Sequence, residues 1–290
     1  MLKGIGLLLV GLVIAGGWWY VTLPDGSEFA HANPQRTAMM QYRDAHGVRA
    51  RPIAWVPLSR IAPALRHAVI VAEDANFYHH KGIDWDATKS ALERDWREHR
   101  FSRGGSTITQ QLAKNLYLEP RKTIWRKGTE ALIALRMEQH LSKPRLLELY
   151  LNVVEWGRGV YGAEAAAQRY FGKPAAGLTI DEASWLAAIL PAPLRYEQHP
   201  RARLVTSRAS TIQHYVEQRL AGQAPPPAPP EMPPMASDEE EPDAPSPEPP
   251  SSTPPALQPD TAATSLPPPP NEPPPAASES TPPQQTTPLY

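Results

Sequence analysis

Hydrophobic positions along most of this chain recur at helical spacing. Leu65, Val69 and Ala72 form one stripe behind Pro63, a residue that favours the first turn of a helix. No long alternating strand pattern and no internal repeat is present. The sequence therefore predicts a mainly α-helical domain over residues 51–221, which is large enough to bury one core. Further helices are predicted near 86–99, 123–140, 143–153, 161–171, 181–189 and 202–220, and Asp181 is predicted to cap the helix that runs through 189.

The segment GGSTITQQLAKN, residues 104–115, predicts a glycine turn followed by an amphipathic helix capped by Ser106. Thr107, Gln111 and Lys114 are spaced i, i+4 and i+7 and share its polar face, opposite an apolar stripe. A hydrogen-bonding row that ends in a cation, beside the positive end of a helix, suits an anionic, oxygen-rich ligand such as a phosphorylated sugar. The alternative is an amphipathic helix whose polar face is simply solvated.

The first 23 residues predict a transmembrane anchor. Residues 4–23 carry no charge and are just long enough to cross a bilayer, and the aromatic run at 18–20 suits a membrane–water interface. Lys3 precedes this run and acidic residues follow it, which favours a cytoplasmic N-terminus and an exported body. A signal peptide cleaved after the small-x-small sequence at 30–32 is the alternative. A polar connector is predicted at 24–50.

Composition changes sharply after Ala224. The segment beyond it holds 25 of the 36 prolines and no lysine or arginine, so residues 222–290 are predicted to be a disordered, proline-rich acidic tail. All 29 basic residues lie in the remaining body, which is net positive and favours anionic partners. The export signal argues against nucleic acid. The absence of cysteine excludes disulfides and thiol chemistry without identifying the compartment.

Glu73 is the first candidate for chemistry. It follows the apolar stripe of the helix that begins at Pro63, and partial desolvation there should raise its pKa and its strength as a base. The alternative is that Glu73 and Asp74 are helix-end residues paired with Arg or His. His79 and His80 suggest a metal, but no second ligand pair at zinc spacing exists, so structural or phosphate-facing histidines are favoured.

A second group of charged residues lies in RKGTE, residues 126–130. Arg126 and Glu130 are spaced as an i, i+4 ion pair, which alone would contribute only a few tenths of a kcal/mol. With Lys127, Lys114 and the basic pair at 121–122 they would instead form a cluster of cations around one carboxylate. Such a cluster suits a diphosphate and its leaving charge.

Four motifs follow one another along the chain. They are Glu73-Asp74-x-x-Phe77-x-x-His80-x-Gly82, Gly105-Ser106-Thr107-x-Thr109-Gln110-Gln111-x-x-Lys114-Asn115, Arg126-Lys127-x-x-Glu130 and Leu147-Glu148-x-Tyr150-Leu151-Asn152. In this order they resemble the peptidoglycan glycosyltransferase family, whose members polymerise lipid II and adopt a lysozyme-like, two-lobed α-helical fold. The stretches VYGAEAAAQRYFGKPAAGLT (160–179) and LAAILPAPLRY (186–196) are similar to its monofunctional branch, the biosynthetic peptidoglycan transglycosylases. The resemblance covers about 58–220.

The resemblance implies a role for each matching residue. Glu73 matches the general base that takes the proton of the acceptor sugar's 4-hydroxyl, and Glu130 matches the acidic residue that organises the cations and helps the diphosphate depart, directly or through a bound metal. Many members have an arginine where this chain has Lys122, preceded by Arg121, so either could supply that charge. The positions that match diphosphate contacts are Lys114, Lys122, Arg126 and Lys127, and those that match polar groove-lining residues are Ser106, Thr107, Gln111 and Asn115.

The implied reaction is a single inverting displacement from an α-linked lipid diphosphate donor, which gives a β(1→4) bond. The resemblance, together with the predicted anchor, implies an inner-membrane enzyme with a periplasmic catalytic domain. It implies no obligatory cofactor and no metal site built by the protein, but Mg²⁺ or Mn²⁺ could bind near the diphosphate. A hydrolase that cuts the same polymer is one alternative. A non-catalytic module that recruits cell wall synthesis or division proteins through its tail is another. Neither Ser-x-x-Lys nor Lys-Thr-Gly, the motifs of a transpeptidase, is present.

Overall fold

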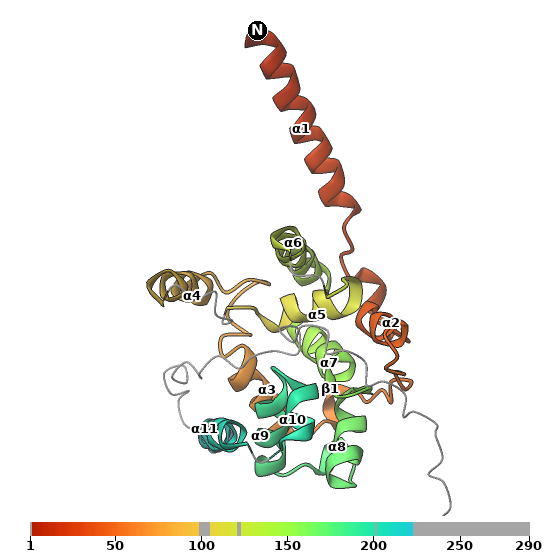
Figure 1. The fold of residues 1–290 in the computed structure, drawn as a ribbon, viewed down its shortest axis with the longest axis vertical. Helices are drawn as coiled ribbons and strands as arrows, with labels where there is room; N and C mark the ends of the chain where they lie inside the picture. The colour runs from red at the N-terminus through yellow and green to blue at the C-terminus, as the bar shows by residue number, and fades with distance from the viewer. Residues whose placement is uncertain (1, 99–104, 121–122, 201, 223–290) are drawn as a thin grey trace, which may run out of the picture. The chain divides into compact units, whose positions relative to one another are not determined.

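The computed structural model describes residues 2–98, 105–120, 123–200 and 202–222, and these residues are mainly helical, as predicted (Figure 1). The predicted tail from residue 223 onward and the basic pair at 121–122 lie outside the described residues. The helices are α1 Leu2–Thr22, α2 Ala38–Ala45, α3 Pro63–Glu73, α4 Trp85–Glu98, α5 Ile108–Tyr117, α6 Ile124–His140, α7 Lys143–Val153, α8 Ala163–Phe171, α9 Ile180–Ile189, α10 Pro193–Gln198 and α11 Arg203–Leu220.

Two of the predicted helix caps are wrong. Thr107, not Ser106, caps α5, and Thr179, not Asp181, caps α9. In both helices the threonine side chain accepts from the backbone N–H three residues on, and the Gln or Glu at that position returns a bond to the threonine N–H. This reciprocal capping box satisfies two of the N–H groups that a helix start leaves without partners, so it favours the threonine over its neighbour.

Some short elements were not predicted from the sequence. Strands β1 (Glu155–Gly157) and β2 (Val160–Tyr161) pair in an antiparallel hairpin that places Trp156 in the core. Helix α2 falls within the predicted connector, where Thr37 caps it and Met39 and Met40 are buried. Helix α10 is also short, and short 3₁₀ turns occur at Ser27–Phe29, Leu58–Arg60 and Ala175–Gly177. Elements of two to eight residues give too few positions for a periodic pattern.

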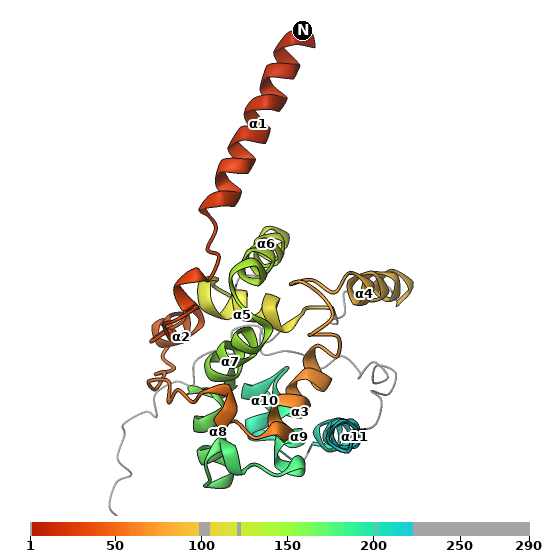
Figure 2. The same cartoon turned by 180° about the vertical axis from the view of Figure 1, so that it is seen from behind.

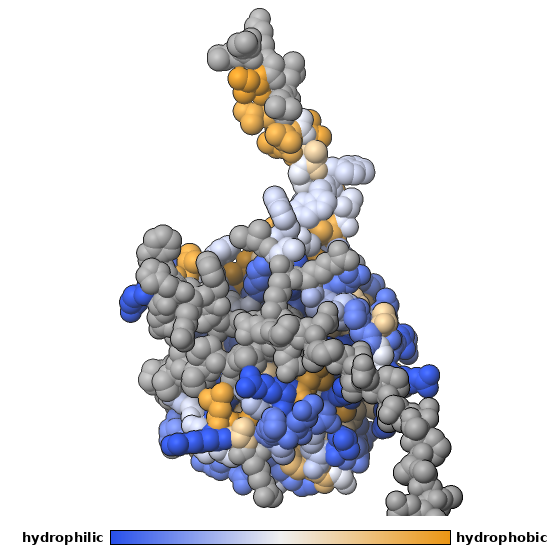
Figure 3. Space-filling view, in the orientation of Figure 1, coloured by the Kyte–Doolittle hydropathy of each residue, from blue (hydrophilic) through white to orange (hydrophobic). Residues whose placement is uncertain are grey.

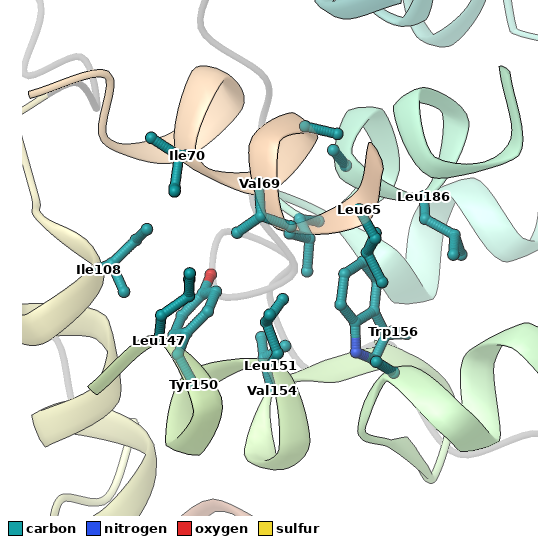
Figure 4. Close-up of a cluster of buried hydrophobic side chains, with 14 of the residues drawn as sticks. Leu65, Val69, Ile70, Ile108, Leu147, Tyr150, Leu151, Val154, Trp156 and Leu186 are labelled. Carbon is teal, nitrogen blue, oxygen red and sulfur yellow. The ribbon is translucent and has the colours of Figure 1, made fainter. Parts of the chain in front are cut away.

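The main core joins two packed groups of helices. Helix α3 packs against α9 and α11, and α5 packs between α6 and α7; Figure 2 shows both groups from behind. Side chains from α3, α5, α7, β1 and α9 meet in one apolar cluster (Figure 4), in which Tyr150 directs its hydroxyl toward α3. This packing brings the C-terminal end of α3 close to the N-terminal half of α5, where the candidate residues gather.

Helix α1 covers most of the uncharged N-terminal run, and Val13, Ile14 and Val21 are among its exposed apolar side chains. Figure 3 shows orange, hydrophobic surface along part of this helix. Within the part of the chain that the structure describes, no helix meets the length and hydropathy needed to span a bilayer. Directly after α1, Asp25 pairs with Arg136 of α6 at 3.3 Å, and the Arg136 guanidinium lies 5.2 Å from the centroid of the Tyr20 ring. These contacts connect the end of α1 to α6.

Candidate active site

Glu73 is the last residue of α3, and its side chain is only 10% exposed. Each of its carboxylate oxygens accepts one hydrogen bond from another helix. Gln111 Nε2 of α5 donates to Oε2 at 2.9 Å, and an Arg208 terminal nitrogen of α11 donates to Oε1 at 3.2 Å. Each oxygen retains acceptor capacity for a further proton or donor. We refer to Glu73, Gln111, Arg208 and Tyr150 as the Glu73 site.

Tyr150 of α7 fixes the orientation of the Gln111 amide. Its hydroxyl donates to Gln111 Oε1 at 2.9 Å, so the amide nitrogen must face the Glu73 carboxylate, which can only accept while it is ionised. Tyr150 is completely buried, and burial raises its pKa well above the usual value. The phenol therefore stays protonated and remains a donor across the physiological range.

Burial raises the pKa of Glu73 above the ordinary value for a glutamate. The Arg208 guanidinium opposes this shift most strongly, followed by the hydrogen bond from Gln111 and the charge of Lys114, while Asp74 adds to it. The carboxyl therefore combines a raised proton affinity with donors that hold its position. This is the combination that a general base requires.

Asp74 has a structural role beside Glu73. Its carboxylate accepts from the Ile108 backbone N–H at 2.9 Å, at the start of α5, and it bonds with His80 Nε2 at 2.9 Å. These bonds connect the end of α3 to the start of α5. For Asp74 and His80, the helix-end pairing considered from the sequence is confirmed. No group of three or more His, Asp or Glu side chains among the described residues could hold a metal ion.

Glu130 lies at the centre of a second group, which we call the Glu130 cluster. Its side chain is 3% exposed and accepts from Arg126 at 2.9 Å and from Lys127 Nζ at 2.7 Å. Lys127 Nζ also donates to Ser106 Oγ at 2.6 Å. The structure therefore joins the start of α6 to the residue that precedes the cap of α5. Two cations pair with the Glu130 carboxylate, whereas the Arg208 guanidinium pairs with Glu73.

Gly82 sets the spacing between these two helices. Its carbonyl accepts from the Thr107 hydroxyl at 2.6 Å, and its φ is +83°. A Cβ atom at this position would lie 3.0 Å from the carbonyl oxygen of Ala134, one turn beyond Glu130 on α6. Only a glycine allows both the left-handed conformation and this close approach without strain. The last glycine of the first sequence motif thus positions the start of α5 against α6.

The remaining predicted residues lie along α5. Thr107 is buried, and its hydroxyl serves both the cap and Gly82. Gln111 follows that cap by one turn, about 6 Å along the helix axis. Lys114 is half-buried and close enough to Glu73 to affect its pKa, and Asn115 is buried. Lys122, together with Arg121, lies outside the described residues.

The fourth motif holds the segment that leads into α3. Glu148 of α7 accepts from the Leu58 backbone N–H at 2.7 Å. Asn152 accepts from the Val56 N–H and donates to its carbonyl, both at 2.9 Å. Arg145 also pairs with Glu148. These bonds attach residues 56–58 to α7 and so fix where α3 begins.

A family model described as "Transglycosylase" matches residues 41–217 of this chain. The chain belongs to this family. The match begins within α2 and ends within α11, so it covers both the Glu73 site and the Glu130 cluster. It confirms the family expected from the four motifs.

Curated relatives are similar over most of their length. A "Biosynthetic peptidoglycan transglycosylase" of Aromatoleum aromaticum is 46% identical over 211 residues, covering 70% of this chain and 91% of the relative. Proteins with the same name from Methylobacillus flagellatus and Nitrosomonas eutropha are 43% and 41% identical, over 68% and 73% of this chain and 83% and 91% of theirs. This confirms the monofunctional branch.

The sequence did not single out Arg208 or the contact of Tyr150 with Gln111. Arg208 lies 135 residues from Glu73 along the chain, and its position within an ordinary helical pattern carries no local signal. Tyr150 fits the pattern of apolar positions along α7, which hides its polar contact. A buried tyrosine usually finds a partner for its hydroxyl, and this requirement is the one signal in the sequence that points to such a contact.

Proposed function

We propose that this transglycosylase polymerises lipid II into β(1→4)-linked glycan strands, with Glu73 as the general base. The observation that carries the proposal is a buried carboxylate of raised pKa, held by donors on two helices, in a chain of this family. The acceptor's 4-hydroxyl is a weak acid, so a base in reach of it accelerates attack on the donor's anomeric carbon. The bond to the diphosphate breaks as the new glycosidic bond forms, with inversion.

The departing diphosphate requires positive charge more than it requires a proton. Arg126 and Lys127 supply two cations at the Glu130 cluster, and Lys114 supplies a third one turn beyond Gln111. Glu130 orients Arg126 and Lys127 before substrate binds, so the diphosphate oxygens would meet preorganised donors. Ser106, Thr107, Gln111 and Asn115 are proposed to line the same substrate path, and Lys122 is proposed to add a further charge.

A divalent cation is proposed as optional. Since the described residues offer no group of three acidic or histidine ligands, Mg²⁺ or Mn²⁺ would take most of its ligands from the diphosphate. The residues of this chain would act without it: Glu73 accepts the proton, and Arg126, Lys127 and Lys114 neutralise the leaving charge. Hydrogen bonds and ion pairs within the protein already hold Glu73, Arg126 and Lys127 in position.

We also propose that the first 23 residues anchor the protein in the inner membrane, with the domain on the periplasmic side. The uncharged run, the exposed aromatic residues Trp18 and Trp19, and the placement of Lys3 support this. The packing of α3, α9 and α11 as one group and of α5, α6 and α7 as another supports the lysozyme-like, two-lobed arrangement expected of the family. The proline-rich tail is proposed to be a spacer or a docking segment for cell wall synthesis or division proteins.

The test compares the full-length protein with the Glu73→Gln variant on purified lipid II, with products separated by size. Glu73→Gln keeps the size and hydrogen-bonding capacity of the side chain but cannot accept the proton, so the rate should fall by roughly 10²–10⁴-fold. The matched control is Glu93→Gln, an exposed glutamate on α4, which should polymerise at the wild-type rate. Equal rates from wild type and Glu73→Gln would contradict the proposal. Muropeptides released from isolated sacculi by the wild type would favour the hydrolase instead.

A further inference from the structure

Helix α11 places two arginines at the C-terminal end of α3. Arg208 donates to the carbonyl of Ala72 at 3.1 Å, and Arg219, three turns later on the same face, donates to the carbonyl of Ala75 at 3.2 Å. The last carbonyls of a helix have no partners within the helix, and they form its negative end. Arg208 therefore satisfies one of these carbonyls, whereas Arg219 binds the carbonyl of Ala75, two residues beyond the end of α3.

Arg208 differs from Arg219 in one respect. Of the two, Arg208 is the one seen to contact the Glu73 carboxylate, at 3.2 Å, and these two paired side chains are 8% and 10% exposed. An ion pair so well shielded from water is screened little by solvent, so removal of one partner leaves the other charge buried and uncompensated. Burial lowers the pKa of Arg208, yet a guanidinium remains protonated at physiological pH.

The other groups around Glu73 do not replace this charge. Gln111 of α5 and Tyr150 of α7 donate hydrogen bonds but are neutral. Lys114 of α5 is positive and lowers the pKa of Glu73 less than Arg208 does, whereas Asp74 raises it. Without Arg208, the carboxyl at the negative end of α3 would have burial, Asp74 and the helix dipole all acting against its ionised form.

We propose that Arg208 is a positioning residue for the transfer reaction, which holds the Glu73 carboxylate ionised and aimed at the acceptor hydroxyl by pairing with Oε1. The inference rests on the proposed role of Glu73 as the general base. Its consequence concerns the acidic limb of the pH–rate profile. A base is active when deprotonated, so activity falls as pH falls through the pKa of Glu73, and a higher pKa moves that limb to higher pH.

The experiment measures kcat/KM for lipid II against pH in the full-length protein, because this ratio reports the groups of the free enzyme. Arg208→Gln keeps a donor for the Ala72 carbonyl and removes the charge. Its acidic limb should move up by about one to three pH units, the usual effect of losing a close opposite charge. Arg208→Lys keeps the charge and should restore most of the shift. Arg219→Gln, the matched control on the same helix face, should leave the limb in place.

The outcomes separate this inference from the proposed function. If wild type polymerises and Glu73→Gln does not, but the limb of Arg208→Gln coincides with that of wild type, Arg208 has no positioning role and the function stands. If Glu73→Gln polymerises at the wild-type rate, the proposed function itself fails. Should Arg208→Gln not fold, the double variant Glu73→Gln/Arg208→Gln decides. Recovery of a folded protein supports the pairing, because the uncompensated charge is gone, and an unfolded double variant overturns it.

Discussion

Substitution of Gly82 by alanine should destabilise the domain because two costs coincide at this residue. Its φ of +83° is a left-handed conformation, which costs an alanine roughly 1–2 kcal/mol. The added Cβ would also lie 3.0 Å from the Ala134 carbonyl oxygen, and forcing extra volume into a packed contact costs about 1–3 kcal/mol more. The expected loss is therefore about 2–5 kcal/mol. At about 2–4 °C per kcal/mol for a domain of this size, Tm should fall by roughly 4–20 °C.

Two other glycines separate these costs. Gly172, at the C-terminal cap of α8, has a φ of +65°, but an alanine methyl group there would have no neighbour within 4 Å among the described residues. Gly172→Ala should therefore show the conformational cost alone, roughly 1–2 kcal/mol. Gly128, inside α6, has neither a positive φ nor a close neighbour in the described part of the chain, so Gly128→Ala should stabilise the helix by up to about 1 kcal/mol.

The assay is thermal unfolding followed by far-UV circular dichroism, with lipid II polymerisation measured well below each Tm. We expect Tm to decrease in the order Gly128→Ala, wild type, Gly172→Ala, Gly82→Ala. Only Gly82→Ala should also reduce the polymerisation rate, because the contact with Ala134 positions α6, and with it Glu130, against the start of α5. Equal losses of stability in Gly82→Ala and Gly172→Ala would show that the close approach to α6 imposes no constraint, and the reasoning would be refuted.

Three further predictions concern the cap of α5, a divalent cation and the C-terminal tail. Thr107→Ala should cost about 0.5–2 kcal/mol of stability through the lost cap, whereas Ser106→Ala should change Tm little; the reverse order in thermal unfolding would reassign the cap. EDTA should leave Tm unchanged, since the described residues hold no three-ligand metal group, and a lowered Tm would contradict this prediction. If EDTA reduces polymerisation and Mg²⁺ restores it, the cation binds with the substrate. Truncation after Ala224 should leave the polymerisation rate on lipid II unchanged if the tail is a spacer, and a slower truncated enzyme would show otherwise.

Local patterns predicted the helices well and their exact ends less well. The 3.6-residue periodicity identified α3, α6, α7 and α11 because each has an apolar face of several turns packed against the core. Ser106 and Thr107 can both cap, and the choice depends on which of them has a Gln or Glu three residues later. Gln110 supplies this for Thr107, so the spacing within the motif already contains the correct cap.

The parts of the candidate site that the sequence did not predict depend on contacts between distant segments. The i, i+4 spacing of Arg126 and Glu130 is local, and the ion pair it predicts is present. The pairing of Glu73 with Arg208 requires α11 to return to the end of α3, which no local pattern specifies. Likewise, the link from Tyr150 through Gln111 to Glu73 joins three helices, and it can be seen only once they are packed.

The two buried glutamates illustrate how one fold can give the same side chain different tasks. Glu130 has a cation on each oxygen, an arrangement suited to holding positive charge ready for a diphosphate. Among the described residues, the Arg208 guanidinium and the neutral Gln111 amide donate to Glu73, so its position is fixed while burial still raises its pKa. More positive charge at Glu73 would lower its pKa further and weaken it as a base, whereas loss of Arg208 would raise its pKa. The pairing of Glu73 with Arg208 thus lies between these limits, which is why the charge of Arg208, more than its packing, should determine the pH at which the enzyme becomes active.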